Sequence, residues 1–167
     1  MRGSSMRALA CCLVFVFAFA LAACAENMDG LNSDPSSSGG KADDDSAEHV
    51  DIEGPDVLQH VQHFANEMCA ATRACTIVTR VGHHPSAERA IDILVSEEFG
   101  LRPTDGNELG DRVAQFTLDH QPEHGVWYVI WRQRYNNGSG WDQMADRGGI
   151  TANHYDHVHV SFNTTVR

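Results

Sequence analysis

The sequence predicts a small α+β domain, with a mostly antiparallel sheet and flanking helices, over residues 54–167. Helical and strand periodicities follow one another in the order helix, strands, helix, strands. The run Val126–Trp131 is almost wholly apolar, which is typical of a central strand covered on both faces. The closing segment His157–Phe162 alternates polar and apolar residues with the period of a strand.

The first half of this domain is predicted to contain one helix and two strands. Gly54-Pro55-Asp56 opens the helix, and His63 is expected on its solvent-exposed surface. A β-branched run at 76–79 is typical of a strand. Residues 90–95 predict a second strand, in which Asp92 stands between two isoleucines. An aspartate in such a core-like strand is costly unless it is paired or coordinated to a metal.

The second half adds a helix and two further strands. Asp105 and Glu108 have the spacing of a capping box, and the helix behind them is expected to end near Gly125. The central strand follows at once. A loop rich in asparagine and glycine at 136–140 then leads toward the closing strand.

The closing strand carries the residues most suited to metal binding. Side chains alternate across a strand, so His157, His159 and Ser161 share one face and the intervening apolar residues share the other. The apolar face can be buried, which leaves two imidazoles at a surface or cleft. Imidazole is the commonest metal-binding side chain, and zinc sites need at least one further donor. The best source of that donor is the segment 82–92, which offers two histidines and an aspartate.

The residues before the domain predict export and attachment to a membrane. Residues 1–23 have the basic start and apolar stretch of a secretion signal. The signal ends in Leu21-Ala22-Ala23-Cys24, which resembles a bacterial lipobox; an ordinary signal peptide is the alternative. Lipidation of Cys24 would tether the protein to the bacterial cell envelope, and Ala25 favours the outer membrane. Residues 24–53 are acidic and poor in large apolar side chains, so we expect a disordered linker.

The cysteines indicate the cellular compartment, and the net charge limits the kinds of partner that the protein can bind. Cys69 and Cys75 remain as an even pair, which outside the cytoplasm predicts a disulfide, with two metal ligands as the alternative. The chain has 12 basic and 23 acidic residues and a formal net charge of −11. Nucleic acid is therefore excluded as a partner, because phosphate binding needs a basic face. We expect a monomer.

Two segments together resemble a known family. A histidine followed by Arg89-Ala90-Ile91-Asp92, with a late His157-x-His159, resembles the LAS-type zinc peptidases. These include the D-alanyl-D-alanine carboxypeptidases and dipeptidases of family M15, which share a fold with the hedgehog signalling domain. The resemblance covers about residues 69–163 and implies a hedgehog/DD-peptidase-like fold. Three stretches look closer still to an uncharacterised bacterial subgroup of secreted domains: 128–134, 146–148 and 152–162.

The resemblance implies a ligand set and catalytic roles. The zinc ligands would be Asp92, His159 and one histidine of the first segment, for which His84 is preferred to His83. His157 would lie beside the metal. The family's carboxylate, usually a glutamate, lies three residues before the last zinc histidine, and an aspartate stands there in this chain.

Each remaining residue has an implied role in hydrolysis. Asp156 would accept a proton from water, and His157 or Arg89 would stabilise the oxyanion. A structural role for Asp92, as the buried partner of Arg89 or of another arginine (Arg132, Arg134 or Arg147), stays open.

Two functions follow from this reading. The first is a membrane-tethered zinc-dependent peptidase or carboxypeptidase that acts on peptidoglycan peptides or another short peptide. The alternative is a non-catalytic, metal-containing module on the same fold that binds the cell wall or a protein. The short carboxylate of Asp156 favours the second function, and His157 beside it favours the first.

Overall fold

The computed structural model describes residues 49–166. The predicted signal sequence, Cys24 and most of the predicted linker lie outside this part of the chain. The elements follow in the order β1 (Ile52–Glu53), α1 (Gln59–Thr72), β2 (Ile77–Val78), a 3₁₀ turn η1 (Ala87–Arg89), β3 (Ala90–Leu94), α2 (Glu108–Asp119), β4 (Val126–Trp131), β5 (Arg134–Asn136), β6 (Asp142–Gln143) and β7 (His157–Phe162). No helix in residues 49–166 is long and apolar enough to cross a bilayer.

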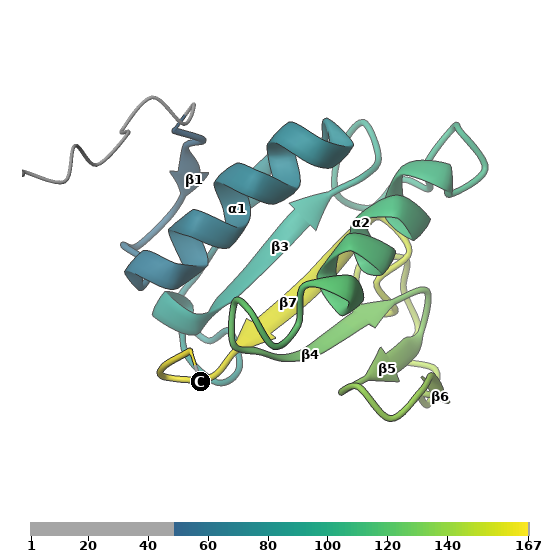
Figure 1. Cartoon of the computed structure of the whole chain (residues 1–167). Helices are drawn as coiled ribbons and strands as arrows, with labels where there is room; N and C mark the ends of the chain where they lie inside the picture. The colour runs from purple at the N-terminus through teal and green to yellow at the C-terminus, as the bar shows by residue number, and fades with distance from the viewer. Residues whose placement is uncertain (1–48, 167) are drawn as a thin grey trace, which may run out of the picture. The chain divides into compact units, whose positions relative to one another are not determined.

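One mixed sheet organises the domain. Its seven strands are joined in the order β1-β2-β3-β7-β4-β5-β6, so the last strand of the chain lies at the centre (Figure 1). The β1–β2 pair is parallel, and the other pairs are antiparallel. The prediction of an α+β fold with a mostly antiparallel sheet is confirmed. β1 occupies the last two residues of the segment predicted as a linker.

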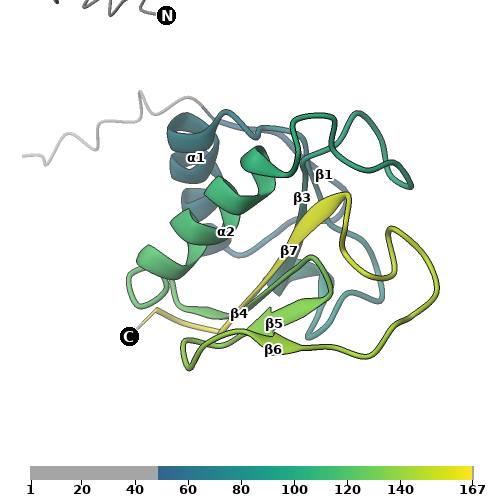
Figure 2. The same ribbon diagram turned by 90° about the vertical axis from the view of Figure 1, so that its right-hand side faces the viewer.

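Both helices cover the same face of this sheet (Figures 1 and 2). Phe64 of α1 meets Phe162 of β7 edge-on, with ring centroids 5.2 Å apart. The buried core joins the inner sides of both helices to alternate residues of the central strands: Val61, Phe64, Ala65, Met68, Ile91, Ile93, Val113, Ala114, Val129, Trp131, Val158, Val160 and Phe162. The apolar side of β7 is therefore buried beneath the helices, and its histidine side faces away from them.

A glycine lets α2 lie close to β4. A Cβ atom at Gly110 would lie 2.1 Å from the indole ring of Trp131, which is fully buried. The indole Nε1–H of Trp131 donates a hydrogen bond to Asp111 of the same helix, over 2.8 Å. The bulky ring and the missing side chain together set how α2 packs on the sheet.

The ends of α1 differ slightly from the prediction. The helix begins at Gln59 and not near Asp56, because the backbone of Leu58 is still extended, with ψ of 148°. The N–H of Leu58 donates to the carbonyl of Glu88 in η1. At the other end, Arg73 has a left-handed backbone with φ of 68° and donates its N–H to Cys69. Cys69, in the last turn of α1, forms the predicted disulfide with Cys75, which lies just beyond the helix.

The region after β4 contains two strands that the sequence did not predict. Arg132 and Gln133 have φ angles of 52° and 58° and turn the chain back, so that β5 pairs with β4. β6 then pairs with β5 on the far side of the asparagine-rich loop. Both strands are short and polar, and for that reason they give no strand periodicity.

Candidate metal centre

The register of two neighbouring strands brings an aspartate and a histidine together. Asp92 of β3 lies directly opposite His159 of β7 in the antiparallel ladder, on the face that the helices do not cover. The His159 Nδ1 atom is 2.7 Å from Asp92 Oδ1, and the two residues are only 7% and 5% exposed. The strands themselves therefore hold these two side chains in place.

A third side chain reaches Asp92 from the loop between β2 and β3. The Nε2 atom of His83 lies 3.0 Å from Asp92 Oδ2. His83, Asp92 and His159 each offer a donor atom, and these atoms all lie within 4.8 Å of one another. The ring of His157 is close as well, with Nε2 3.6 Å from Asp92 Oδ1. We call His83, Asp92, His157 and His159 the sheet cluster.

Electrostatics keep the central carboxylate ionised. Burial raises the pKa of Asp92, but hydrogen bonds from His159 and His83 and the charge of nearby imidazoles outweigh it and hold the pKa well below its usual range. The bond to Asp92 in turn raises the pKa of His83. His159 and His83 thus supply the partners that this buried carboxylate needs.

A second aspartate fixes the orientation of His157. Asp156 is fully buried, and its Oδ1 atom lies 2.6 Å from His157 Nδ1. Its Oδ2 atom accepts hydrogen bonds from the N–H of Gly100, over 2.6 Å, and from the hydroxyl of Thr151, over 2.5 Å. Burial raises the pKa of Asp156, but these bonds lower it to about 2. Since Asp156 is ionised, the Nδ1 atom of His157 carries the proton that lies between them.

One member of the sheet cluster, His159, borders a cavity of about 460 Å³. His159 and His154 line it, together with an aromatic and apolar wall and one arginine: His84, Trp127, Tyr128, Ile130, Tyr135, Met144 and Arg147. The His154 Nδ1 atom is buried and, among the residues the structure describes, has no hydrogen-bond partner. Burial lowers the pKa of His154 to about 3, so its ring is neutral at ordinary pH.

The two adjacent histidines of the first segment have different surroundings. His83 contacts Asp92, whereas His84 turns to Tyr128, whose hydroxyl lies 2.9 Å from His84 Nδ1. His84 is exposed and lines the cavity. The sequence predicts His84 as the ligand, whereas in the structure His83 lies next to the other donor atoms. The choice of His84 as a ligand stays a prediction.

The arginine predicted to assist catalysis points elsewhere. The guanidinium of Arg89 donates to Ser86 Oγ over 3.4 Å and to Thr164 Oγ1 over 3.1 Å. The arginine beside the sheet cluster is Arg80, whose Nη2 atom lies 3.8 Å from Asp92 Oδ2. Sequence reasoning gave Arg80 no role, and it follows β2 with no periodicity to mark it. Its position depends on the pairing of β2 with β3.

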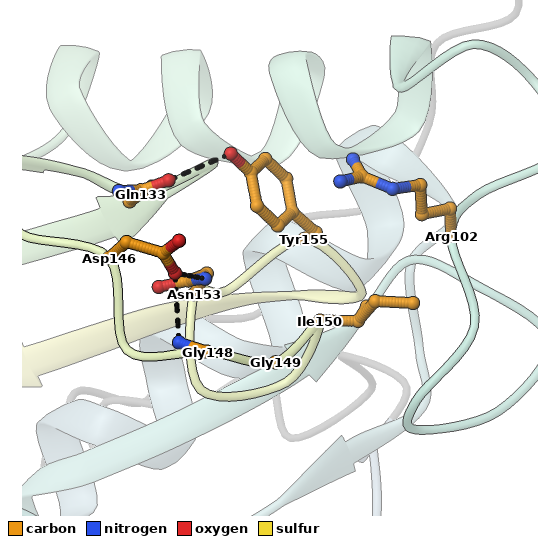
Figure 3. Close-up of a pocket in the computed structure, with 8 residues that line it drawn as sticks. All are labelled: Arg102, Gln133, Asp146, Gly148, Gly149, Ile150, Asn153 and Tyr155. Atoms are coloured by element: carbon orange, nitrogen blue, oxygen red, sulfur yellow. Dashed lines mark hydrogen bonds between the residues drawn. The ribbon is translucent and has the colours of Figure 1, made fainter.

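The loop that carries His154 is held by a polar network around a second cavity of about 390 Å³ (Figure 3). Asp146 accepts hydrogen bonds from the N–H of Gly148 and the amide of Asn153, over 2.8 and 2.6 Å. Tyr155 donates to Gln133 over 2.9 Å, and the guanidinium of Arg102 lies 4.0 Å from the centre of the Tyr155 ring. These contacts fix the residues on both sides of His154.

His154 is the second residue to which the sequence gave no role. The one available signal was a third imidazole, five positions before His159. Its φ angle is 55°, so it lies in a turn and not in the strand. Alternation along β7 therefore could not place its side chain.

Comparison with known proteins identifies the family. A family model described as "VldE, C-terminal domain" matches residues 53–155. This match covers more than half of the chain, and the chain belongs to that family. No solved structure is similar enough to count as a match.

One relative is an uncharacterized secreted protein of Arthroderma benhamiae (strain ATCC MYA-4681 / CBS 112371). It is 31% identical over 84 residues, which cover 40% of this chain and 34% of the relative. The chain therefore spans about a third of the length of this relative.

Proposed function

We propose that this member of the VldE C-terminal domain family is an exported zinc-dependent peptidase that acts on short peptides, above all those of peptidoglycan. The observation that carries the proposal is the buried carboxylate of Asp92, which lies between His83 and His159. His159 also lines a cavity. The resemblance of the sequence to the LAS-type peptidases supports the same reading.

The residues present fit a zinc ion. Two imidazoles and one carboxylate are a common set of three protein donors in catalytic zinc sites. We assign His83, Asp92 and His159 as the ligands, with His83 in place of His84, because their donor atoms already lie within 4.8 Å of one another. When bound there, zinc polarises a carbonyl group and makes water more acidic.

The side chains next to these ligands would handle the proton. Asp156 is buried and ionised, and both of its oxygens are engaged, so it positions His157 and does not itself meet water. The other ring nitrogen of His157, Nε2, faces Asp92 and lies 3.6 Å from its Oδ1 atom. We therefore assign His157 as the proton acceptor and Asp156 as its positioning residue, in the manner of other aspartate–histidine pairs.

The cavity suits the end of a peptide. Trp127, Tyr128 and Met144 provide apolar surface, and Arg147 provides a positive charge. A guanidinium recognises a carboxylate with two parallel hydrogen bonds, so Arg147 would bind the C-terminal carboxylate of a substrate. This arrangement favours a carboxypeptidase.

Export and lipid attachment are part of the proposal. The relative from Arthroderma benhamiae is named as secreted, and the Cys69–Cys75 disulfide suits an oxidising compartment. We propose that Cys24 carries the lipid, in the cell envelope. Expression with radiolabelled palmitate checks this, since a Cys24→Ser variant would lose the label.

Metal content and digestion of peptidoglycan together test the activity. The full-length chain is stripped with EDTA, loaded with zinc and analysed for metal, beside Asp92→Asn and, as a control, the exposed His49→Gln. We expect the wild type and His49→Gln to release product, and Asp92→Asn to lose a zinc ion and release none. A zinc-loaded wild type that binds peptidoglycan without cleaving it would favour the non-catalytic module. A wild type without metal at the sheet cluster would remove both functions.

A further inference from the structure

We propose a second zinc site, formed by His63, Glu67 and His124, on the helical side of the domain. We call these residues the helix cluster. His63 and Glu67 belong to α1, and His124 belongs to the connection between α2 and β4. A metal there would join α1 to the chain that leaves α2. The site would stabilise the fold and is independent of the proposed peptidase chemistry.

One carboxylate holds both imidazoles of this cluster. The Nε2 atom of His63 lies 2.9 Å from Glu67 Oε1, and the Nε2 atom of His124 lies 3.0 Å from Glu67 Oε2. His63 and Glu67 are one helical turn apart, whereas Glu67 and His124 are separated by 57 positions. The folded chain therefore directs two ring nitrogens from distant segments at the same group.

A simple surface ion pair does not explain why a buried histidine, His124, also contacts Glu67. Helical spacing alone explains the contact between His63 and Glu67. His124, however, is only 2% exposed, and its ring packs edge-on against Phe64 at 5.4 Å between centroids. A buried imidazole held in this way has a fixed direction, and Nε2 points out of the core toward Glu67. The cluster thus has one rigid donor beneath two adaptable ones.

The exposed members leave a route for a metal ion. The side chains of His63 and Glu67 are 62% and 39% exposed. The three donor atoms lie within 4.8 Å of one another, and donors around a tetrahedral zinc are separated by about 3.4 Å. Small rotamer changes of His63 and Glu67 would close this gap, while His124 stays in place. Water would complete the coordination on the solvent side.

The donor set selects the metal. Two imidazole nitrogens and one carboxylate oxygen suit zinc and its neighbours among the transition metals. Calcium and magnesium prefer oxygen donors alone, so they do not fit this cluster. Because binding favours the folded state over the unfolded state, zinc at the helix cluster would raise the melting temperature.

Titration of the full-length chain with zinc chloride tests the site. The chain is stripped with EDTA and followed by isothermal titration calorimetry, beside Glu67→Gln, His63→Ala and Asp92→Asn. His60→Gln is the matched control, because His60 lies on α1 but outside the helix cluster. We expect about two zinc ions per chain for the wild type and His60→Gln, and about one for each of the other variants. In the absence of metal, Glu67→Gln and His63→Ala should melt at the wild-type temperature.

The outcomes separate the second site from the proposed function. Equal zinc stoichiometry for wild type, Glu67→Gln and His63→Ala would overturn the helix cluster as a metal site. The wild type could also bind only one zinc ion. If Glu67→Gln and His63→Ala lose that ion and Asp92→Asn keeps it, the result would support the helix cluster and count against the proposed peptidase. A zinc-dependent rise in melting temperature that persists in Asp92→Asn but is lost in Glu67→Gln supports the second site independently.

Discussion

The sheet cluster and the helix cluster use the same kinds of side chain in two different settings. Each places a carboxylate between histidines, but the side chain of Asp92 is 7% exposed and that of Glu67 is 39% exposed. The first stands on paired strands, on the face of the sheet away from the helices. The second lies in the helical layer on the other face.

The difference shows how the surroundings prepare a binding site. In the sheet cluster the ladder fixes Asp92 opposite His159, and Asp156 fixes His157, so most of the geometry exists before any ligand arrives. In the helix cluster only His124 is fixed by burial. A buried charge must have partners, whereas water can satisfy an exposed one. The sheet cluster should therefore tolerate substitution far less well.

Removal of the two carboxylates is the strongest test of this comparison. In the metal-free chain, Asp92→Ala leaves His83 and His159 without their acceptor in a buried place. We expect a loss of about 3 kcal/mol in the free energy of unfolding. Glu67→Ala should cost less, about 1 kcal/mol, because Glu67 and His63 are within reach of water and only His124 is buried. Urea unfolding of both variants checks this, and equal losses would mean that burial does not distinguish the clusters.

The next largest effect concerns the proton acceptor of the sheet cluster. His157→Gln removes the ring nitrogen that faces Asp92 but does not remove a proposed zinc ligand. We expect kcat on peptidoglycan peptides to fall about 100-fold, as for loss of a general base, with unchanged zinc content. The control is His60→Gln, which changes a histidine of α1 that contacts neither cluster. An unchanged rate in His157→Gln would assign proton transfer to another residue.

The histidine side of β7 could be predicted from the sequence because it depends on local structure alone. Alternation along a strand places His157, His159 and Ser161 on one face wherever the strand lies in the sheet. The need for partners around Asp92 was also visible, because two isoleucines flank it. The strand order, in which β3 and β7 are neighbours, then brings these residues together.

The rest of the site depends on contacts between distant segments. His83 and His84 are adjacent in a loop without periodicity, so the sequence cannot distinguish them. Their side chains differ because His84 contacts Tyr128, which is 44 positions away in the chain. The environment of Asp156 is set by Gly100 and Thr151, which no pattern links to it. The helical spacing of α1 predicts that His63 lies at the surface. The approach of a buried histidine from beyond α2 requires the folded chain.

The loss of unfolding free energy at acid pH measures how strongly the folded structure stabilises the ionised carboxylate of Asp156. Its pKa is lowered from a usual value of 3.8 to about 2, so its contribution is present above the unfolded value and is lost as pH falls through the folded one. Wild type should therefore exceed Asp156→Asn in unfolding free energy by about 2 kcal/mol at neutral pH, with the difference vanishing toward about pH 2. Urea unfolding at a series of pH values checks this. A difference independent of pH would show that Asp156 acts through shape and not through charge.

The smallest predicted effect tests whether the outer contacts of the sheet cluster matter. Thr151→Val removes the hydroxyl that bonds Asp156 and leaves the bond from Gly100 in place. We expect a loss of about 1 kcal/mol in stability and a fall of about tenfold in kcat, because His157 is then less firmly oriented. The exposed Thr104→Val is the matched control and should change neither quantity. If both variants kept the wild-type rate, the strand alone would orient His157, and burial of the carboxylate would be the main difference between the two clusters.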